Sequence, residues 1–200
     1  MNFIGVRACI HNVFDDAIED AAIVGGAARD KFYGLEPKDI DYAVVLSPWF
    51  QDDMKVFRLL SELSEELSFV GVKSDVLQAY GKEEGREIAP GTFSDRIFGV
   101  MRIYADDTVV ELLVTKRNSL EEMISEFDTS MNQFMMRVNP IDGSTLPQYV
   151  GKPEDHMKLV GLKFKTECRL AINDDRRERM RIKYNKIKEQ SSRLYGEILP

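Results

Sequence analysis

The segment from Asp39 to Leu46 constrains the fold of this 200-residue chain more than any other. It begins with Asp39-Ile40-Asp41 and continues in apolar and aromatic residues, the pattern of a buried β-strand. Side chains two residues apart on a strand share a face, so the two carboxylates should stand side by side while Ile40 turns into the core. Like charges repel unless a cation lies between them, and Mg²⁺ prefers carboxylate oxygens. The pair predicts a metal site, with a solvated strand edge or a turn as the alternative.

A glycine pair lies fourteen residues before Asp39. Ala22-Ile23-Val24 predicts a short strand that ends at Gly25-Gly26, and a helix is expected over residues 27–33. Glycines let the backbone approach a phosphate closely, and the free N–H groups at a helix start can bind an anion. Arg29 and Asp30 fall in the first turn of that helix. A plain tight turn is the structural alternative, and neither a P-loop nor a dinucleotide fingerprint is present.

The rest of the chain alternates helical and strand patterns. The spacing of Phe14, Ile18 and Ala22 predicts a short first helix, and residues 97–104 and 108–115 predict a β-hairpin. We expect an α/β or α+β domain with a mixed sheet flanked by helices at residues 1–151, and a basic helical segment at residues 152–200. The other expected elements are helices at 52–69, 120–125, 130–138 and 174–195, a strand at 70–80, and loops at 81–94 and 139–151.

Composition excludes several classes of protein. A hydrophobic fraction of 44% and a charged fraction of 30% are typical of a globular domain. Neither a signal peptide nor a membrane span is expected, so the cytoplasm is the expected location, and no membrane partner is expected. Cys9 and Cys168 lie far apart and form no C-x-x-C pair, which favours free thiols over a disulfide or a zinc site.

The charge is distributed unevenly along the chain. The net charge is −7, but residues 157–200 hold twelve Lys/Arg against six Asp/Glu, a balance of +6, which leaves −13 for the first 156 residues. Such asymmetry indicates a polyanionic partner. At helical spacing Arg177, Arg181 and Lys188 fall near one side of the last helix, and we expect this side to bind RNA phosphates; the other side carries Arg176, Arg179, Lys183 and Lys186. The alternative is a solvated helix docked onto the domain through Met180, Tyr184 and Ile187.

The motifs together resemble a known family. The run from Ile23 to Asp30, then Gly34, then Lys38-Asp39-Ile40-Asp41, resembles the head domain of bacterial-type CCA-adding enzymes and poly(A) polymerases. The family writes it V-G-G-x-x-R-D, L-G and K-D-x-D at this spacing, and it belongs to the polymerase-beta-like nucleotidyltransferase superfamily. Residues 98–103 resemble its F-G-T-V strand, and residues 110–114 resemble its V-E-I-A strand, which supplies a third metal-facing carboxylate, here Glu111. The resemblance covers residues 20–151.

Two stretches depart from the family pattern. The segment ending at Asp128 and Asn132 resembles the family's R-R-D-F-T-I-N, but Glu126 and Phe127 stand where the family has two arginines associated with nucleotide contacts. Nucleotide handling should therefore differ. Beyond Gly151 the match fades, and residues 174–177 only loosely resemble the family's base-reading E-D-x-x-R motif. A head with a short appendage would suit a compact genome such as a phage's, which would place the protein in the host cytoplasm.

The resemblance implies an enzyme with two Mg²⁺ ions that moves a nucleotide from ATP or CTP to an RNA 3′-hydroxyl, with the 3′ end of tRNA as the leading acceptor. Asp39, Asp41 and Glu111 would be the catalytic metal ligands. Two alternatives stay open: a nucleotidyltransferase that modifies a protein or a small molecule or acts as a toxin on tRNA, and a non-catalytic RNA- or nucleotide-binding module. The acceptor, the preferred nucleotide and the oligomeric state are left open. The residues implied to bind the nucleotide are Gly25, Gly26, Arg29, Asp30, Asp128 and Asn132.

Overall fold

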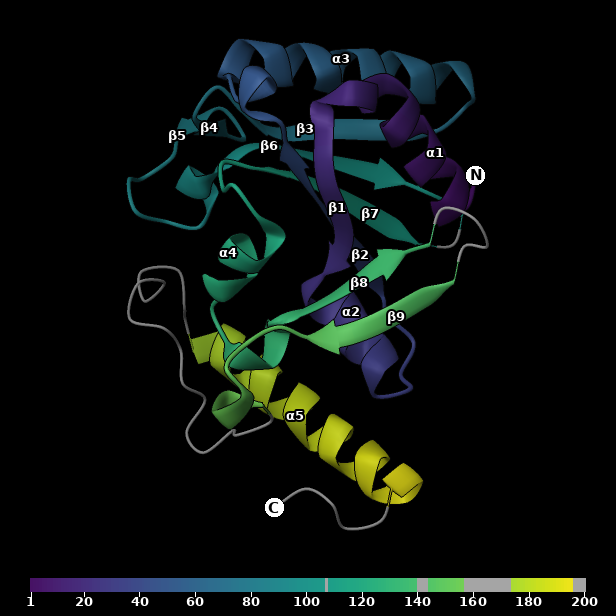
Figure 1. The fold of residues 1–200 in the computed structure, drawn as a ribbon, viewed down its shortest axis with the longest axis vertical. Coiled ribbons are helices and arrows are strands. Elements are labelled where there is room, and N and C mark those ends of the chain that lie inside the picture. The colour runs from purple at the N-terminus through teal and green to yellow at the C-terminus, as the bar shows by residue number, and fades with distance from the viewer. Residues whose placement is uncertain (107, 140–143, 157–173, 196–200) are drawn as a thin grey trace.

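A nine-stranded sheet runs through the molecule in the order β5-β4-β3-β6-β7-β2-β1-β8-β9 (Figure 1). The computed structural model describes residues 1–106, 108–139, 144–156 and 174–195, with residues 191–195 described by backbone alone. Strands β2 and β7 pair in parallel, and the other pairings are antiparallel. The expected mixed sheet flanked by helices is therefore confirmed.

The helices and strands follow one another closely. The strands are β1 (Ile18–Val24), β2 (Asp39–Leu46), β3 (Lys73–Ala79), β4 (Lys82–Glu83), β5 (Arg86–Glu87), β6 (Ile97–Tyr104), β7 (Val109–Thr115), β8 (Phe134–Val138) and β9 (Thr145–Tyr149). The helices are α1 (Phe3–Phe14), α2 (Gly25–Phe32), α3 (Asp53–Phe69), α4 (Leu120–Ser125) and α5 (Asp174–Tyr195).

The alternation along β2 divides the core between the two faces of the sheet. Tyr42, Val44 and Leu46 point to the larger core, which α1, α2, α3 and part of α5 cover. Ala43 and Val45 point to the smaller core under α4. Because side chains alternate on a strand, Asp39 and Asp41 share the α4 face, and Ile40 packs against the larger core as expected. The two carboxylates therefore lie on the face of β2 opposite the larger core.

Two expected helices are wrong, and both contain a strand of the central sheet. The spacing of Phe14, Ile18 and Ala22 is helical, but the real helix is α1, whose buried residues Val6, Ile10 and Phe14 carry the same spacing toward the N-terminus. Asp15 has a positive φ of 34° and ends that helix, and β1 begins at Ile18. Strand β1 lies between β2 and β8, so pairing on both sides overrides its helical periodicity.

The second wrong helix is the one expected at 130–138. A short 3-10 turn, Ser130–Asn132, is followed by strand β8, which pairs with β1 through Ile23↔Met136 and Val24↔Met135. Strand β9 then occupies part of the expected loop at 139–151. It contains Pro147, which cannot donate to a ladder and is tolerated because β9 is an edge strand. The hairpin of β6 and β7 is confirmed, although Asp107 of its turn lies outside the described residues.

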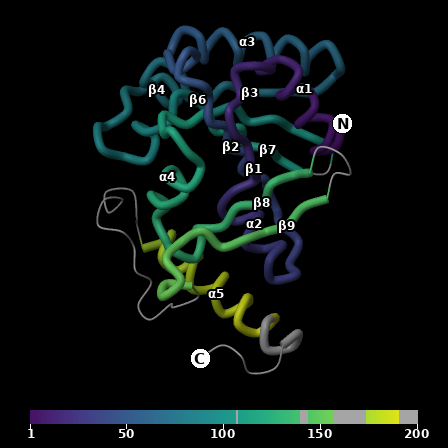
Figure 2. Tube along the Cα trace, in the orientation of Figure 1, coloured from purple at the N-terminus to yellow at the C-terminus, as the bar shows by residue number. Residues whose placement is uncertain are grey.

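The chain begins at one end of the molecule and reaches α5 at the other. Figure 2 traces it from α1 and α3 past the sheet to α5, which is bonded to α2 through Lys183 and Asp30. Over the described ranges, no helix is both long enough and apolar enough to cross a bilayer. Cys9 is a free thiol, and Cys168 lies outside the described residues.

Candidate active site

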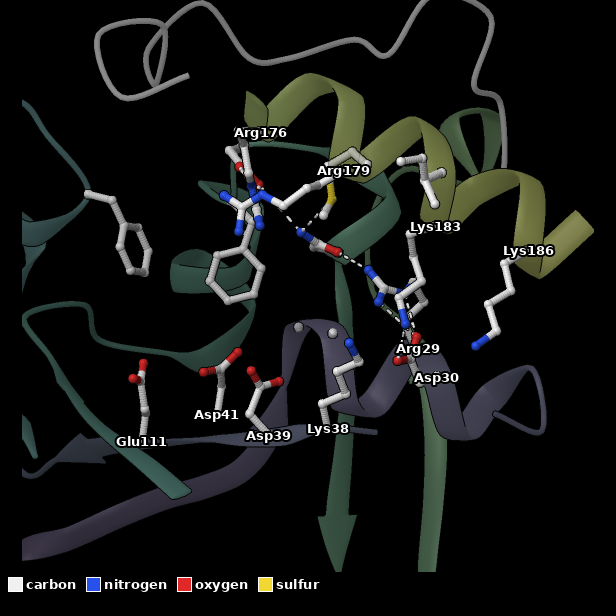
Figure 3. A pocket seen from close by; sticks show the side chains of 18 of the residues that line it. Arg29, Asp30, Lys38, Asp39, Asp41, Glu111, Arg176, Arg179, Lys183 and Lys186 are labelled. Atoms are coloured by element: carbon white, nitrogen blue, oxygen red, sulfur yellow. Dashed lines mark hydrogen bonds and ion pairs between the residues drawn. The ribbon is translucent and has the colours of Figure 1, made fainter. Parts of the chain in front are cut away.

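A cavity of about 710 Å³ lies between the start of β2, the start of α2 and the inward face of α5 (Figure 3). It brings together residues from segments far apart in the sequence. Every residue expected to bind metal or nucleotide lines it: Gly25, Gly26, Arg29, Asp30, Asp39, Asp41, Glu111, Asp128 and Asn132. Phe93, Leu113 and Ile182 line the same cavity, although no motif in the sequence indicated them.

The three expected carboxylates share one face of the sheet. Asp41 and Glu111 are Cα partners across the parallel β2–β7 pairing, and Asp39 lies two residues before Asp41 on the same strand. Directly opposite residues in neighbouring strands have adjacent side chains, so register alone brings the two strands' carboxylates together. Figure 3 shows Glu111, Asp41, Asp39 and then Lys38 in a row along one wall of the cavity.

The electrostatic cost of this arrangement falls mainly on Asp41. Burial raises the pKa of the Asp41 carboxyl from 3.8 to about 7, and the charges of Glu111 and Asp39 add to the rise. Arg176 and Arg29 oppose it but do not cancel it. A buried group surrounded by like charges resists ionisation, and a cation bound against it would relieve that resistance.

Glu111 is bonded to an arginine in this structure. Arg102, its Cα partner on β6, donates to the same Glu111 oxygen from Nε at 2.9 Å and from Nη2 at 2.5 Å. Within the ranges that the structure describes, no three His, Cys, Asp or Glu side chains are close enough to hold a metal ion together. The pair that fits a hard cation is therefore Asp39 and Asp41, and Glu111 would have to leave Arg102 to join them.

The turn between β1 and α2 is shaped by Gly25. Its φ is +69°, a left-handed conformation that costs any residue with a Cβ, and it brings the backbone beside the carboxylates. A Cβ at this position would lie 3.4 Å from Asp41 Oδ2 and 3.5 Å from Phe127 Cε2. No side chain caps the start of α2, so its first N–H groups remain available to a ligand. Uncapped N–H groups at a helix start are the kind of group that can bind an anion.

The remaining predicted nucleotide-binding residues form a polar network with one another. Arg29 donates to Asp30 from Nε at 2.9 Å and from Nη2 at 2.7 Å, and its Nη1 donates to Asn132. Asn132 in turn donates to Asp128 at 3.4 Å. Arg29 and Asp30 are each about 3% exposed, so both charges are buried as a pair. In this structure these side chains shape the cavity wall and satisfy one another.

Helix α5 is joined to both ends of this network. Arg176 donates to Asp128 from Nε at 2.7 Å and from Nη2 at 3.2 Å, and Lys183 donates to Asp30 at 2.6 Å. The two cations lie seven residues apart, about two helical turns. Met180 and Ile187 are buried in the larger core, and Tyr184 packs against it. The helix is therefore docked on the domain by apolar contacts and by two ion pairs.

The inward face of α5 carries Arg176, Arg179, Lys183 and Lys186, which all line the cavity. The three residues expected to bind RNA, Arg177, Arg181 and Lys188, are not among the lining residues. Arg177 and Arg181 pair within the helix, with Asp174 at 3.5 Å and Glu178 at 3.2 Å. Helical periodicity separated the two sets, but only docking determines which of them faces inward.

The two positions that depart from the family pattern have separate roles. Glu126 accepts from Arg117 at 2.7 Å and lies 3.1 Å from Arg96, so its carboxylate is neutralised away from the carboxylate row. Phe127 lines the cavity and packs edge-on against Phe93, with ring centroids 5.7 Å apart. Part of the cavity wall is therefore apolar, at Phe93 and Phe127.

Comparisons with known proteins come from solved structures. No protein-family model matches the chain, and no curated protein does either. The chain is similar to a tRNA nucleotidyltransferase complexed with a primer tRNA and an incoming ATP analogue, at 21% identity and a TM-score of 0.38 over 64% of this chain and 31% of that one. It is also similar to a tRNA-processing enzyme in an apo form, at 22% identity and a TM-score of 0.41 over 73% and 33%. A CCA-adding enzyme complexed with CTP gives 12% identity and a TM-score of 0.42 over 72% and 28%. The chain thus spans about a third of the length of these structures, and at TM-scores below 0.5 its function has to be argued from its own residues.

Proposed function

We propose that this protein is a metal-dependent nucleotidyltransferase, which transfers a nucleoside monophosphate from ATP or CTP to an RNA 3′-hydroxyl. The observation that carries the proposal is the pairing of two carboxylates with an anion site in one cavity. Neither Asp39 nor Asp41 makes a hydrogen bond or ion pair with another described residue, and the uncapped start of α2 lies beside them. A cation between the carboxylates and a phosphate at the helix start would complement both charges.

The chain's own residues would act as follows. Asp39 and Asp41 hold Mg²⁺, and Glu111 completes the site when it leaves Arg102. The N–H groups at the start of α2, at Gly25 and Gly26, bind the phosphates of the nucleotide. Bound Mg²⁺ would activate the attacking hydroxyl and neutralise the leaving pyrophosphate, as two ions do in related chemistry.

The reaction balances without any other reactant. The acceptor oxygen forms a bond to the α-phosphorus, and the bond from the α-phosphorus to the bridging oxygen breaks in line with it. The bonding electron pair leaves with pyrophosphate, and the hydroxyl proton passes to solvent. The carboxylates of β2 would position the metal and the N–H groups at the start of α2 would position the phosphates, and such positioning accounts for much of the rate of phosphoryl transfer.

The acceptor is proposed from the motif resemblance. The run from Ile23 to Asp41 resembles heads that act on the 3′ end of tRNA, and the basic C-terminal segment offers charge for an RNA. Product analysis with labelled ATP and CTP against RNA, protein and small-molecule acceptors would identify the acceptor class.

The proposal is tested by removing one carboxylate at a time. Asp39→Asn and Asp41→Asn should keep the fold and lower Mg²⁺-dependent transfer by several kcal/mol of transition-state stabilisation, about a thousandfold or more. Asp75→Asn is the matched control, because Asp75 lies on β3 outside the cavity and accepts from Tyr104 at 2.9 Å. Transfer close to the wild-type rate by either cavity variant would remove the metal assignment.

A further inference from the structure

The four cations on the inward face of α5 alternate in their partners. Arg176 and Lys183 are bonded to Asp128 and Asp30, and they hold the helix in place. Arg179 and Lys186 also line the cavity, yet neither side chain makes a hydrogen bond or ion pair with any other described residue. Both are exposed to the cavity solvent. Arg176 and Lys183 therefore attach α5 to the domain, and Arg179 and Lys186 remain available to bind a ligand.

The charges that remain in the cavity after its internal pairs are removed have a definite arrangement. Arg29, Asp30 and Lys183 satisfy one another, as do Arg176 and Asp128, and Glu111 is bonded to Arg102. Two carboxylates and three cations are then left without a described partner, namely Asp39 and Asp41 and the trio Lys38, Arg179 and Lys186. A ligand that complements both groups carries a divalent cation at one part and several negative charges at another. A metal–nucleoside triphosphate has that charge pattern.

We propose that Arg179 and Lys186 of α5 bind the terminal phosphates of the nucleoside triphosphate. This inference rests on the proposed function, and it names the residues that hold the leaving pyrophosphate. Glu126 and Phe127 occupy the positions of two family arginines, and Glu126 is itself neutralised by Arg117. The positive charge missing from that segment is supplied instead from the C-terminal helix, across the same cavity.

The order of residues along the cavity gives the nucleotide a direction. In Figure 3 the row runs from Glu111 through Asp41 and Asp39 to Lys38, and Lys186 extends from α5 at the Lys38 end. The end with Glu111 has carboxylates, which suits an attacking hydroxyl near the metal. The end with Lys38 and Lys186 has only cations without partners, which suits the departing phosphates. Arg179 and Lys186 are seven residues apart, about 10 Å along the helix, so each can contact a different phosphate.

A nucleotide fits this face better than an RNA backbone does. Arg179 and Lys186 line the same 710 Å³ cavity as Asp39 and Asp41, and α5 encloses it from the side opposite β2. Small-molecule sites are concave and bury most of their ligand, whereas a polynucleotide follows an extended surface. The outward face of α5, with Arg177 and Arg181 exposed, is the surface open to an extended RNA.

The test compares ligands that differ only in their terminal phosphates. ATP, AMP and inorganic pyrophosphate, each with Mg²⁺ and without acceptor, are titrated calorimetrically into the full chain. Arg179→Gln and Lys186→Gln should each weaken ATP and pyrophosphate binding by about tenfold, the usual effect of losing one charged hydrogen bond, and leave AMP binding unchanged. Lys186→Arg keeps the positive charge, so its ATP affinity should stay close to that of the wild type. Arg58→Gln is the charge-matched control, because Arg58 is exposed on α3 and does not line the cavity.

The outcomes separate this inference from the proposed function. If both Gln variants keep the wild-type ratio of ATP to AMP affinity, α5 does not bind the terminal phosphates and the inference is wrong, whether or not transfer occurs. If the ratio of ATP affinity to AMP affinity falls by about tenfold in the Gln variants and stays unchanged in Arg58→Gln, the inference holds. The transfer assay with Asp39→Asn then decides the proposed function separately, because Asp39 lies on the other wall of the cavity.

Discussion

Glu111 is the residue whose state in this structure differs most from its proposed role. Its carboxylate is bonded to Arg102 on one side, while Asp41 is its Cα partner on the other. Both side chains of the ion pair are partly exposed, 39% for Arg102 and 29% for Glu111, so the pair contributes little to stability, about 0–1 kcal/mol. Arg102 and Mg²⁺ would compete for the Glu111 carboxylate, and the divalent Mg²⁺ should displace Arg102 once it is present.

This competition predicts a gain from removing the arginine. Arg102→Gln should lower the Mg²⁺ concentration that gives half-maximal transfer, by roughly threefold to tenfold, since the competing contact is worth about 1 kcal/mol. The measurement is a Mg²⁺ titration of transfer with saturating nucleotide, supported by calorimetric Mg²⁺ binding. Arg58→Gln should leave the titration where it is. An unchanged or higher Mg²⁺ concentration for half-maximal transfer in Arg102→Gln would show that Glu111 does not serve as a metal ligand.

The carboxylates could be found from sequence because their geometry is local. Asp39 and Asp41 share a face by the two-residue period of a strand, and Glu111 follows from the resemblance to the family's strand. Arg102 could not be assigned to Glu111 in the same way, because the contact depends on the register between β6 and β7. The partners of Asp30 and Asp128 depend on α5, which lies 153 and 48 residues away along the chain.

At the scale of elements, the turn from β1 into α2 depends on a backbone conformation. Gly25 adopts a φ of +69° beside Asp41, and Gly81 adopts a φ of +68° in a surface turn with no atom within 4 Å of its missing Cβ. The two glycines therefore have the same left-handed backbone conformation and differ in their surroundings, so each serves as the control for the other.

This pair predicts equal losses of stability and unequal losses of binding. Gly25→Ala and Gly81→Ala should each lower the free energy of unfolding by about 1–2 kcal/mol, the cost of a left-handed Ala, as followed by chemical denaturation. Only Gly25→Ala should weaken ATP binding, because relaxing its φ moves the N–H groups at the start of α2. If Gly25→Ala binds ATP as tightly as Gly81→Ala does, the phosphates bind somewhere other than the start of α2.

The attachment of α5 gives a second prediction for an element. Lys183→Met removes one of the two ion pairs that hold the helix and leaves Asp30, whose side chain is 5% exposed, with Arg29 alone. Losing a charged hydrogen bond to a buried group should destabilise the docked helix by about 1.5–3 kcal/mol. Hydrogen exchange in α5 should speed up while exchange in β2 and β7 stays slow. Arg181→Met removes an exposed pair with Glu178 and should have almost no effect. Equal exchange in both variants would mean that the ion pairs do not hold the helix.

Sequence patterns predicted helices and strands correctly where the hydrophobic periodicity and the tertiary surroundings of a segment favour the same structure. β2, β6, α4 and α5 have the expected bounds, and α3 begins one residue late because Asp52 caps it, accepting from Met54 and Lys55. The failures are β8 and the first part of β1, which the sequence predicts as helices and which lie in neighbouring strands. The end of β1, Ala22-Ile23-Val24, is predicted as a strand and is one. The apolar residues of the two mispredicted segments fit either a helix or a strand, and only long-range pairing decides between the two. The inward face of α5 could not be chosen for the same reason, since both faces are basic.

At the scale of the molecule, an acidic domain carries a basic helix on one side of its cavity. The first 156 residues have a balance of −13 and the last 44 a balance of +6. Inside the cavity the opposite charges face one another, with carboxylates on β2 and cations on α5. The outward face of α5 adds further positive charge outside the cavity. This division suits a nucleotide inside and a polyanionic acceptor outside.

The outward face predicts a separate effect on RNA. Changing Arg177, Arg181 and Lys188 together to Ala should weaken RNA binding and flatten its salt dependence by about 2 log units per decade, at roughly 0.7 per phosphate contact on a single strand. ATP binding should stay intact, because none of the three lines the cavity. The control removes three exposed charges from α3, β4 and β5, namely Arg58, Lys82 and Arg86. An unchanged affinity and salt slope in the α5 triple variant would make that face structural.

The cavity is proposed to catalyse metal-dependent nucleotidyl transfer to RNA. This proposal is tested most directly by incubating the full chain with α-labelled ATP or CTP and tRNA lacking its 3′ end, with Mg²⁺ or with a chelator. We expect label covalently attached to the RNA 3′ terminus and one pyrophosphate released per nucleotide added, both abolished by the chelator and by Asp39→Asn. Labelled RNA that forms equally well with the chelator, or no labelled RNA from any acceptor despite tight binding of Mg²⁺ and ATP, would contradict it.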